Sequence, residues 1–202
     1  MYELRSVVLA SVSPRRFELL NSLGLEVRVV KSDVDEGERP GYAPRELAAL
    51  HASAKAGAVA RRETSAVIVA ADTVVDLDGK SLGKPRDRAE AATTLRKLSG
   101  RDHVVHTAYV VHDTSRDGII SGVSSTRVSF AELDDATIEN YIATGEPMDK
   151  AGSYGIQGRG AALVREIDGD FYTVMGFPLG EFVRRLGELG YMLSSKSAGD
   201  AP

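Results

Sequence analysis

The chain has 202 residues, of which 43% are hydrophobic and 27% charged, as expected for a globular protein with one large domain or two small lobes. Its net charge of −4 disfavours a general binder of nucleic acids or membrane surfaces, and no stretch approaches the roughly 20 apolar residues of a membrane span. Because the chain has no cysteine, disulfides and thiolate chemistry are excluded. The apolar run at 7–10 is too short for a signal peptide, so we expect a cytoplasmic protein.

Predicted strands and helices alternate along the chain. Runs rich in β-branched residues predict strands at 6–10, 27–30, 66–71, 103–112, 119–130 and 161–167. Caps and apolar spacing predict helices at 14–22, 44–62, 87–99, 134–143 and 178–189. Asp78-Gly79 predicts a tight hairpin. We therefore expect an α/β fold, with a mixed twisted sheet flanked by helices and two lobes around a central cleft. Residues 1–193 form one domain in this interpretation, followed by a disordered tail at 194–202.

The first helix follows an apolar run and a turn that carries two hydroxyls, Ser11 and Ser13. Ser13 suits the N-cap, and Pro14 suits the first helical position, where a missing N–H costs nothing. Arg15 and Arg16 in the first turn oppose the helix dipole, so stability alone does not favour them. Together with the helix N-terminus they would bind a polyphosphate well. A surface helix with two solvated arginines is the alternative for this segment alone.

A single acid, Asp72, directly follows the apolar run 66–71. Because ligands of open α/β sheets bind beyond the carboxyl ends of strands, an acid there is well placed for a metal or a water. The predicted hairpin returns the chain to Lys84, which could reach the same cleft. A capping role for Asp72 and a solvated loop position for Lys84 are the alternatives.

A glycine-rich segment at 149–160 has glycines at 152, 155, 158 and 160, which would let the backbone approach a ligand closely. Gln157 offers a donor and an acceptor on one amide, which suits the edge of a nucleobase. The spacing is neither a Rossmann fingerprint nor a Walker A motif, and taken alone such a loop is more often a connector.

An acidic cluster follows the predicted strand at 27–30, and its members are Asp33, Asp35, Glu36 and Glu38. Such acids usually form a solvated loop, but one of them could share a Mg²⁺ with Asp72. Lys55, on the helix at 44–62, is a further candidate phosphate ligand, although most helical lysines are surface residues. The four histidines show no zinc-ligand spacing and receive no chemical role in this interpretation.

These segments together resemble the Maf family of nucleoside triphosphate pyrophosphatases. The matching segments are 11–16 (SVSPRR), 71–75 (ADTVV), 84–87 (KPRD), 98–100 (LSG), 149–158 (DKAGSYGIQG) and 174–179 (VMGFPL). The resemblance covers about residues 5–190. It implies hydrolysis of a nucleoside triphosphate between the α- and β-phosphates, with Mg²⁺ or Mn²⁺ as cofactor and a homodimer as the assembly.

The resemblance also implies roles for individual residues. The implied phosphate ligands are Ser11, Arg15, Arg16, Lys55 and Lys84. Glu36 and Asp72 would bind the metal, and Asp72 would activate the attacking water.

Three features match the branch of the family that resembles dTTP/UTP pyrophosphatases, namely Arg15-Arg16, Asp72-Thr73 and the sequence YGIQG at 154–158. The implied specificity residues are Arg16, Thr73 and Gln157, and Gln157 could pair with the O4/N3–H edge of uracil or thymine. Three alternatives stay open: an enzyme acting on CTP, 7-methyl-GTP or modified nucleotides, a non-catalytic nucleotide-binding regulator of cell division, and a nucleic-acid-binding protein.

Overall fold

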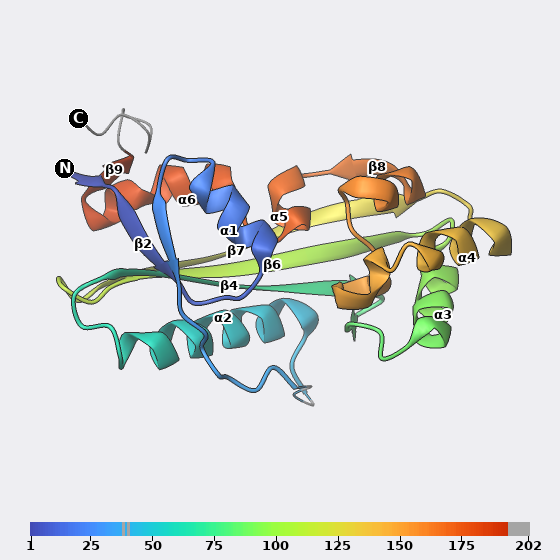
Figure 1. Cartoon of the computed structure of the whole chain (residues 1–202), viewed down its shortest axis with the longest axis horizontal. Helices are drawn as coiled ribbons and strands as arrows, with labels where there is room; N and C mark the ends of the chain where they lie inside the picture. Colours follow the sequence, from blue (N-terminus) through green and yellow to red (C-terminus); the bar gives the residue numbers. More distant parts are fainter. Residues whose placement is uncertain (38, 40, 194–202) are drawn as a thin grey trace.

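A twisted sheet of seven strands forms the centre of the molecule, with helices on both of its faces (Figure 1). The computed structural model describes residues 1–37, 39 and 41–193. Glu38 and the tail expected at 194–202 lie outside the described residues. No helix within the described residues is long and apolar enough to cross a membrane.

The strands are β1 (Tyr2–Leu4), β2 (Ser6–Leu9), β3 (Glu26–Val29), β4 (Val67–Leu77), β5 (Lys80–Leu82), β6 (Asp102–Asp113), β7 (Gly118–Phe130), β8 (Val164–Asp168) and β9 (Tyr191–Leu193). The α-helices are α1 (Pro14–Asn21), α2 (Pro44–Ala60), α3 (Arg88–Leu98), α4 (Asp135–Ala143), α5 (Phe171–Met175) and α6 (Leu179–Arg185). The 3-10 helices are η1 (Glu146–Asp149), η2 (Ala151–Ser153), η3 (Gly158–Leu163) and η4 (Leu186–Leu189).

The strand order of the main sheet is β3-β2-β4-β6-β7-β8, and β5 pairs with β4 off this path. β2 runs parallel to β3 and β4, whereas the other pairs are antiparallel, so the predicted mixed sheet is confirmed. A separate parallel pair joins β1 to β9. On its β2 side, β4 pairs with β2 at Ile68 and Val69 and with β5 from Val75 onward. No described strand pairs with residues 70–74 on that edge.

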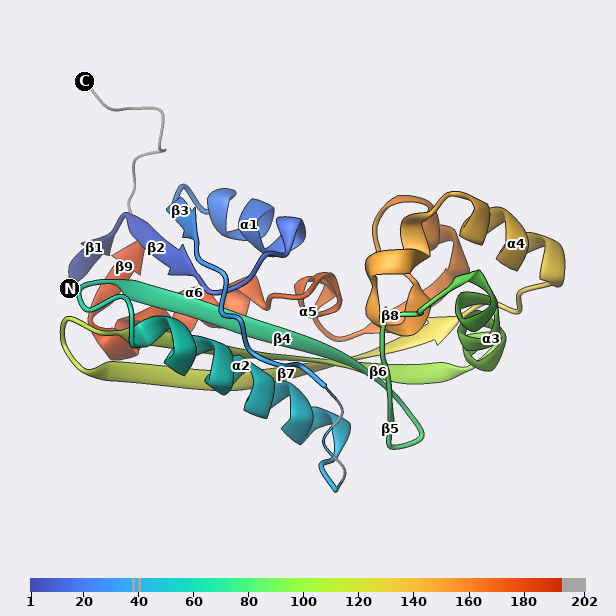
Figure 2. The same ribbon diagram turned by 60° about the horizontal axis from the view of Figure 1, so that its bottom comes forward.

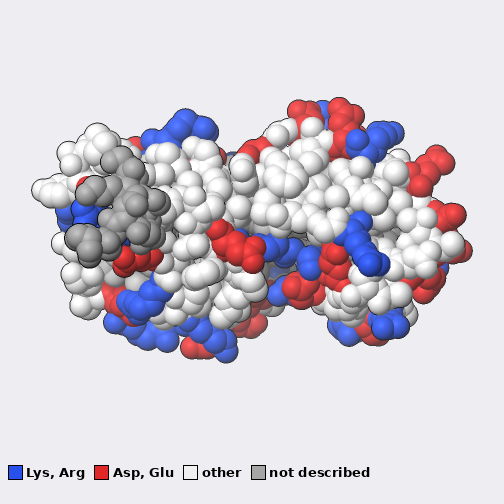
Figure 3. All heavy atoms as spheres, turned by 45° about the horizontal axis from the view of Figure 1, so that its top comes forward, with Lys and Arg blue, Asp and Glu red and all other residues white. Residues whose placement is uncertain are grey.

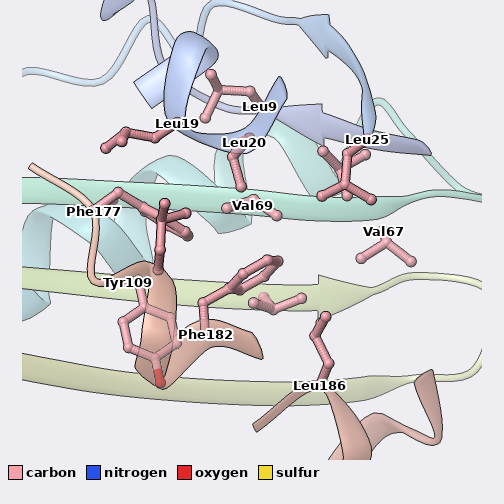
Figure 4. Close-up of a cluster of buried hydrophobic side chains, with 14 of the residues drawn as sticks. Leu9, Leu19, Leu20, Leu25, Val67, Val69, Tyr109, Phe177, Phe182 and Leu186 are labelled. Atoms are coloured by element: carbon pink, nitrogen blue, oxygen red, sulfur yellow. The ribbon is translucent and has the colours of Figure 1, made fainter. Parts of the chain in front are cut away.

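Two hydrophobic clusters fill one half of the molecule, on opposite faces of the sheet. The first packs α1 and α6 against β2, β4 and β6 through side chains such as Leu20, Val69 and Phe182 (Figure 4). On the other face, α2 presents Ala48 and Ala52, which are fully buried. These small side chains allow the helix axis to lie close to the strands.

A third cluster forms the core of the other half, where α3 and α4 pack beside the ends of β4, β6 and β7. Its largest buried side chains include Phe130, Tyr154 and Leu95. Figure 2 shows the long strands β4, β6 and β7 running through both halves. The expected two lobes therefore share one continuous sheet.

Several predicted details are confirmed and others are wrong. The side chain of Asp87 caps α3 by accepting a hydrogen bond from the Glu90 amide at 2.8 Å, and Asp78 and Gly79 both have the positive φ of a tight hairpin turn. The strand predicted at 161–167 begins only at Val164, because a 3-10 helix occupies residues 158–163. The helix predicted at 178–189 is α-helical only to Arg185 and continues as η4. The short elements β1, α5 and β9 were not predicted.

Candidate active site

A pocket of about 640 Å³ opens where β2 ends beside β4. Residues from the β2–α1 turn, the segment after β3, the exposed edge of β4 and the segment 146–158 form its walls. Six basic and five acidic side chains line it, so positive and negative groups face one shared space. Figure 3 shows basic side chains gathered in the hollow between the two halves, with acidic ones beside them.

Asp72 lies in the middle of β4, opposite Ala108 of β6, and not at the end of a strand as predicted. The strand that ends at the pocket is β2, whose carboxyl end leads into the turn with Ser11. Asp72 lines the pocket although it is largely buried, and β4 has no described partner strand there on its β2 side. Alternation along β4 places Asp72 on the α2 face and Thr73 on the opposite face. The rule that ligands bind beyond strand ends therefore applies to β2.

The carboxylates of Asp72 and Glu36 meet at the ammonium of Lys55. Lys55 Nζ donates to Asp72 Oδ1 at 2.7 Å and lies 3.0 Å from Glu36 Oε2 and 3.5 Å from the backbone oxygen of Ala71. The side chain of Lys55 is only 4% exposed, whereas that of Glu36 is 49% exposed. The Lys55 ammonium thus contacts three protein oxygens, and Glu36 is the partner that a ligand can displace most easily.

Asp72 and Glu36 present oxygens of the kind that a hard divalent cation binds, and the ammonium of Lys55 lies between them. The described residues contain no group of three or more His, Cys, Asp or Glu side chains arranged to hold a metal. Such a cation takes one or two carboxylates and completes its shell with water and phosphate oxygens.

His51 also contacts Asp72, and the sequence interpretation missed it. Its Nδ1 lies 3.3 Å from Asp72 Oδ2, while its buried Nε2 has no hydrogen-bond partner among the described residues. His51 and Lys55 are four residues apart on α2, so the helical period places them on the same face. That spacing was the signal in the sequence that could have identified His51.

Arg16 holds three chain segments together at the other side of β4. Its guanidinium donates to Ser11 Oγ and Thr73 Oγ1, both at 3.0 Å, and to the carbonyl oxygen of Gly176 at 2.9 Å. Burial lowers the pKa of Arg16, and the negative charges of Asp72 and Glu36 raise it in part. Three of its five N–H groups are used in this way, which leaves two that can reach a ligand.

Arg15 and Lys84 are different, because neither makes a hydrogen bond or ion pair with the described residues, although both line the pocket. Arg15 is partly buried and Lys84 is exposed. Unpaired cations beside a concave surface attract anionic ligands.

The glycine-rich segment lines the pocket through residues that include Gly155, Gln157 and Gly158. The Gln157 side chain is exposed and makes no hydrogen bond within the described part of the chain. The glycines, however, make room for protein groups rather than for a ligand. A Cβ on Gly158 would lie 2.9 Å from Glu146 Oε2, and one on Gly160 would lie 2.2 Å from the backbone oxygen of Gly155.

The structure thus brings all nine predicted site residues to one pocket: Ser11, Arg15, Arg16, Glu36, Lys55, Asp72, Thr73, Lys84 and Gln157. Their separate roles stay predictions. Of the other predicted acids, Asp33 lines the pocket, whereas Asp35 does not.

A family model described as "Maf-like protein" matches residues 6–189. A dTTP/UTP pyrophosphatase from Geotalea uraniireducens is 47% identical over 92% of this chain and 95% of its own length. Proteins of the same name from Geobacter sulfurreducens and Bacillus velezensis are 48% and 47% identical, each over 91% of this chain and 96% of their own length. Among solved structures, a HAM1 protein from Coxiella burnetii matches 92% of this chain and all of its own with a TM-score of 0.51; at 17% identity it shows a shared fold.

Proposed function

The chain belongs to the Maf family, and on that basis we propose that it is a nucleoside triphosphate pyrophosphatase acting on dTTP and UTP. The products would be the nucleoside monophosphate and pyrophosphate. The observation that carries the proposal is the single pocket in which unpaired cations, Arg15 and Lys84, face the same space as the carboxylate of Asp72. The names of the relatives support the reaction class and the two substrates.

Asp72 is our candidate for the group that accepts a proton from the attacking water. A carboxylate has about four lone-pair sites, and Lys55 and His51 occupy one on each oxygen. The remaining sites can bind water. Hydrolysis requires that water to attack the α-phosphorus, and a fixed carboxylate within hydrogen-bond reach can remove its proton.

Negative charge grows on the phosphate oxygens during this attack, and positioned cations stabilise it. We assign Arg15 and Lys84 to this role first, because their donors are not engaged by the described protein. Arg16 can contribute the two N–H groups that its three protein hydrogen bonds leave over. Lys55 lies between two carboxylates, and a phosphate could replace the half-exposed Glu36 as its partner more easily than the buried Asp72.

A divalent cation, Mg²⁺ or Mn²⁺, would be held by Glu36 and Asp72. When bound, it would neutralise phosphate charge and favour loss of pyrophosphate. Gln157 would select the base, because its free amide can donate to O4 and accept from N3–H of uracil or thymine. Cytosine presents the opposite polarity on that edge and would leave polar groups unmatched. The homodimer and the cytoplasmic location implied by the family resemblance remain predictions.

The first experiment is pyrophosphate release from dTTP, UTP, CTP, GTP and 7-methyl-GTP with Mg²⁺ or Mn²⁺ and after chelation, with Asp72→Asn as the blank. We expect rapid release from dTTP and UTP, and at least a ~10²-fold loss in the variant if Asp72 serves as base or metal ligand. Preference for CTP or 7-methyl-GTP would refute the assigned specificity. No release from any nucleotide by the folded protein would favour a non-catalytic regulator.

A further inference from the structure

The loop that carries Gln157 is tied to two side chains outside it, Tyr141 at the end of α4 and Glu146 at the start of η1. Glu146 accepts hydrogen bonds from the amides of Arg159 and Gly160, both at 3.1 Å. On the other side of Gln157, the amide of Gly155 donates to the Tyr141 hydroxyl at 3.0 Å. The backbone is therefore fixed both before and after Gln157.

Tyr141 and Glu146 also form a hydrogen bond with each other, so their contacts with the loop belong to one connected network. The Tyr141 hydroxyl donates to Glu146 Oε1 at 3.0 Å while it accepts from the Gly155 amide. Burial raises the pKa of Tyr141, so its hydroxyl keeps the proton that it donates. We call Tyr141 and Glu146 the loop clamp.

The glycine spacing agrees with the loop clamp. A Cβ on Gly158 would lie 2.9 Å from Glu146 Oε2, and one on Gly160 would lie 2.7 Å from the Tyr141 hydroxyl. Side chains at these positions would push the loop away from the clamp. The glycines thus permit the close approach that the hydrogen bonds require.

We propose that Tyr141 and Glu146 are positioning residues that set nucleobase selectivity by holding the Gln157 loop in one conformation. The inference rests on the proposed function, in which the Gln157 amide reads the base edge. The Gln157 amide can rotate about its own Cγ–Cδ bond, but the fixed backbone limits the positions from which this amide can approach a base. Without the clamp the amide could approach either base from more positions, so we expect weaker discrimination between uracil and cytosine.

The test compares wild type with Tyr141→Phe and Glu146→Gln. Tyr141→Phe removes the hydroxyl but keeps the ring in the core. Glu146→Gln keeps the shape of the side chain but replaces one carboxylate oxygen, which accepts a hydrogen bond from a backbone amide, with an NH₂ group that cannot accept one. Tyr172→Phe is the matched control, because the Tyr172 side chain is 42% exposed and lies outside the pocket lining. Two quantities are measured: the ratio of kcat/KM for UTP to that for CTP, and amide hydrogen exchange of the peptide covering 154–163 without nucleotide.

We expect both clamp variants to lower the UTP/CTP ratio by about tenfold and to speed exchange in this peptide by about tenfold, with the control unchanged. General destabilisation would lower both rates together and leave the ratio unchanged, so the ratio separates positioning from folding. Faster exchange with an unchanged ratio, or a lower ratio with unchanged exchange, would each overturn the proposal. A wild type that hydrolyses neither nucleotide would instead refute the proposed function, and the clamp proposal would fall with it.

Discussion

Lys55 Nζ lies 2.7 Å from Asp72 Oδ1, with both side chains less than 10% exposed. This pair joins the middle of α2 to the middle of β4. Removing charges from water is costly, so neither partner is favourable there without the other. The ion pair explains how an acid can lie inside a buried strand, and it leaves that acid at the wall of the pocket.

Lys55→Met is therefore expected to lower the free energy of unfolding by roughly 3–5 kcal/mol, because it leaves the Asp72 carboxylate buried without its cation. Adding Asp72→Asn should restore part of that loss, since the neutral amide no longer needs a cation. Urea denaturation of the two single variants and the double variant measures the coupling. Lys97→Met, at an exposed lysine of α3, is the control. Additive losses in the double variant would contradict a coupled pair.

The sequence allowed the order of most elements to be predicted, because apolar runs and caps are local signals. It also allowed the site residues to be grouped, since the turn at Ser11 and the ADTVV segment carry recognisable motifs. The length of β4 could not be predicted in the same way. Asp72-Thr73 looked like the end of a strand, because the partners that make these polar residues acceptable lie elsewhere in the chain. Lys55 is 17 residues away and Arg16 is 57 residues from Thr73.

The glycine loop shows a second limit of the sequence. Its four glycines indicated close approach of the backbone to something, but the pattern could not say to what. Tyr141 and Glu146 precede the loop and carry no motif that links them to Gly158 or Gly160. Only the fold places these side chains against the loop.

His51 should matter for turnover, because its Nδ1 is placed to donate to Asp72 Oδ2. His51→Leu removes this donor, and we expect kcat for UTP to fall roughly tenfold with little change in KM, a loss similar to that caused by removing hydrogen-bond partners of metal-binding side chains. His51→Asn keeps a donor near the position of Nδ1 and should retain most of the activity. Steady-state kinetics with both variants tests this. Equal activity of the two variants would show that the Nδ1 contact does not support catalysis.

Two hydroxyls, those of Thr73 and Thr107, connect Arg16 by hydrogen bonds to the backbone of Thr173. Thr107 Oγ1 donates to the carbonyl of Thr173 at 2.7 Å, so in its 2.9 Å contact with Thr73 it must accept. Thr73 in turn accepts from Arg16. Because Thr107 is fully buried, Thr107→Val leaves the Thr73 hydroxyl proton without its acceptor and removes one donor from the Thr173 carbonyl, which keeps the Gly176 amide. The substitution should cost about 1–3 kcal/mol of unfolding free energy. Thr107→Ser keeps the hydroxyl, so a similar loss in both variants, measured by urea denaturation, would assign the effect to packing instead.

The buried His103 should make the protein sensitive to acid. His103 Nε2 lies 2.7 Å from the Tyr154 hydroxyl, and its ring packs edge-on against Phe130. Burial lowers the pKa of His103 from 6.5 to about 4, while the charge of Asp102 opposes this shift only in part. Between these two values the unfolded chain binds a proton that the folded protein does not, so unfolding becomes easier as the pH falls.

The contribution of His103 is fully present above about pH 6.5 and is lost as the pH falls to about 4, by an amount on the order of 2–3 kcal/mol. His103→Gln removes the titrating group but can still form a hydrogen bond with Tyr154. The variant is expected to start from a lower stability at pH 7 and to lose less of it on acidification. Urea denaturation at a series of pH values between 7 and 4 gives both curves. Parallel curves would mean that His103 does not titrate differently in the folded and unfolded states. The acid sensitivity would then have to come from carboxylates such as Asp113. Burial raises the pKa of Asp113, but hydrogen bonds from Ser115 and Tyr191 outweigh this effect and lower the pKa overall.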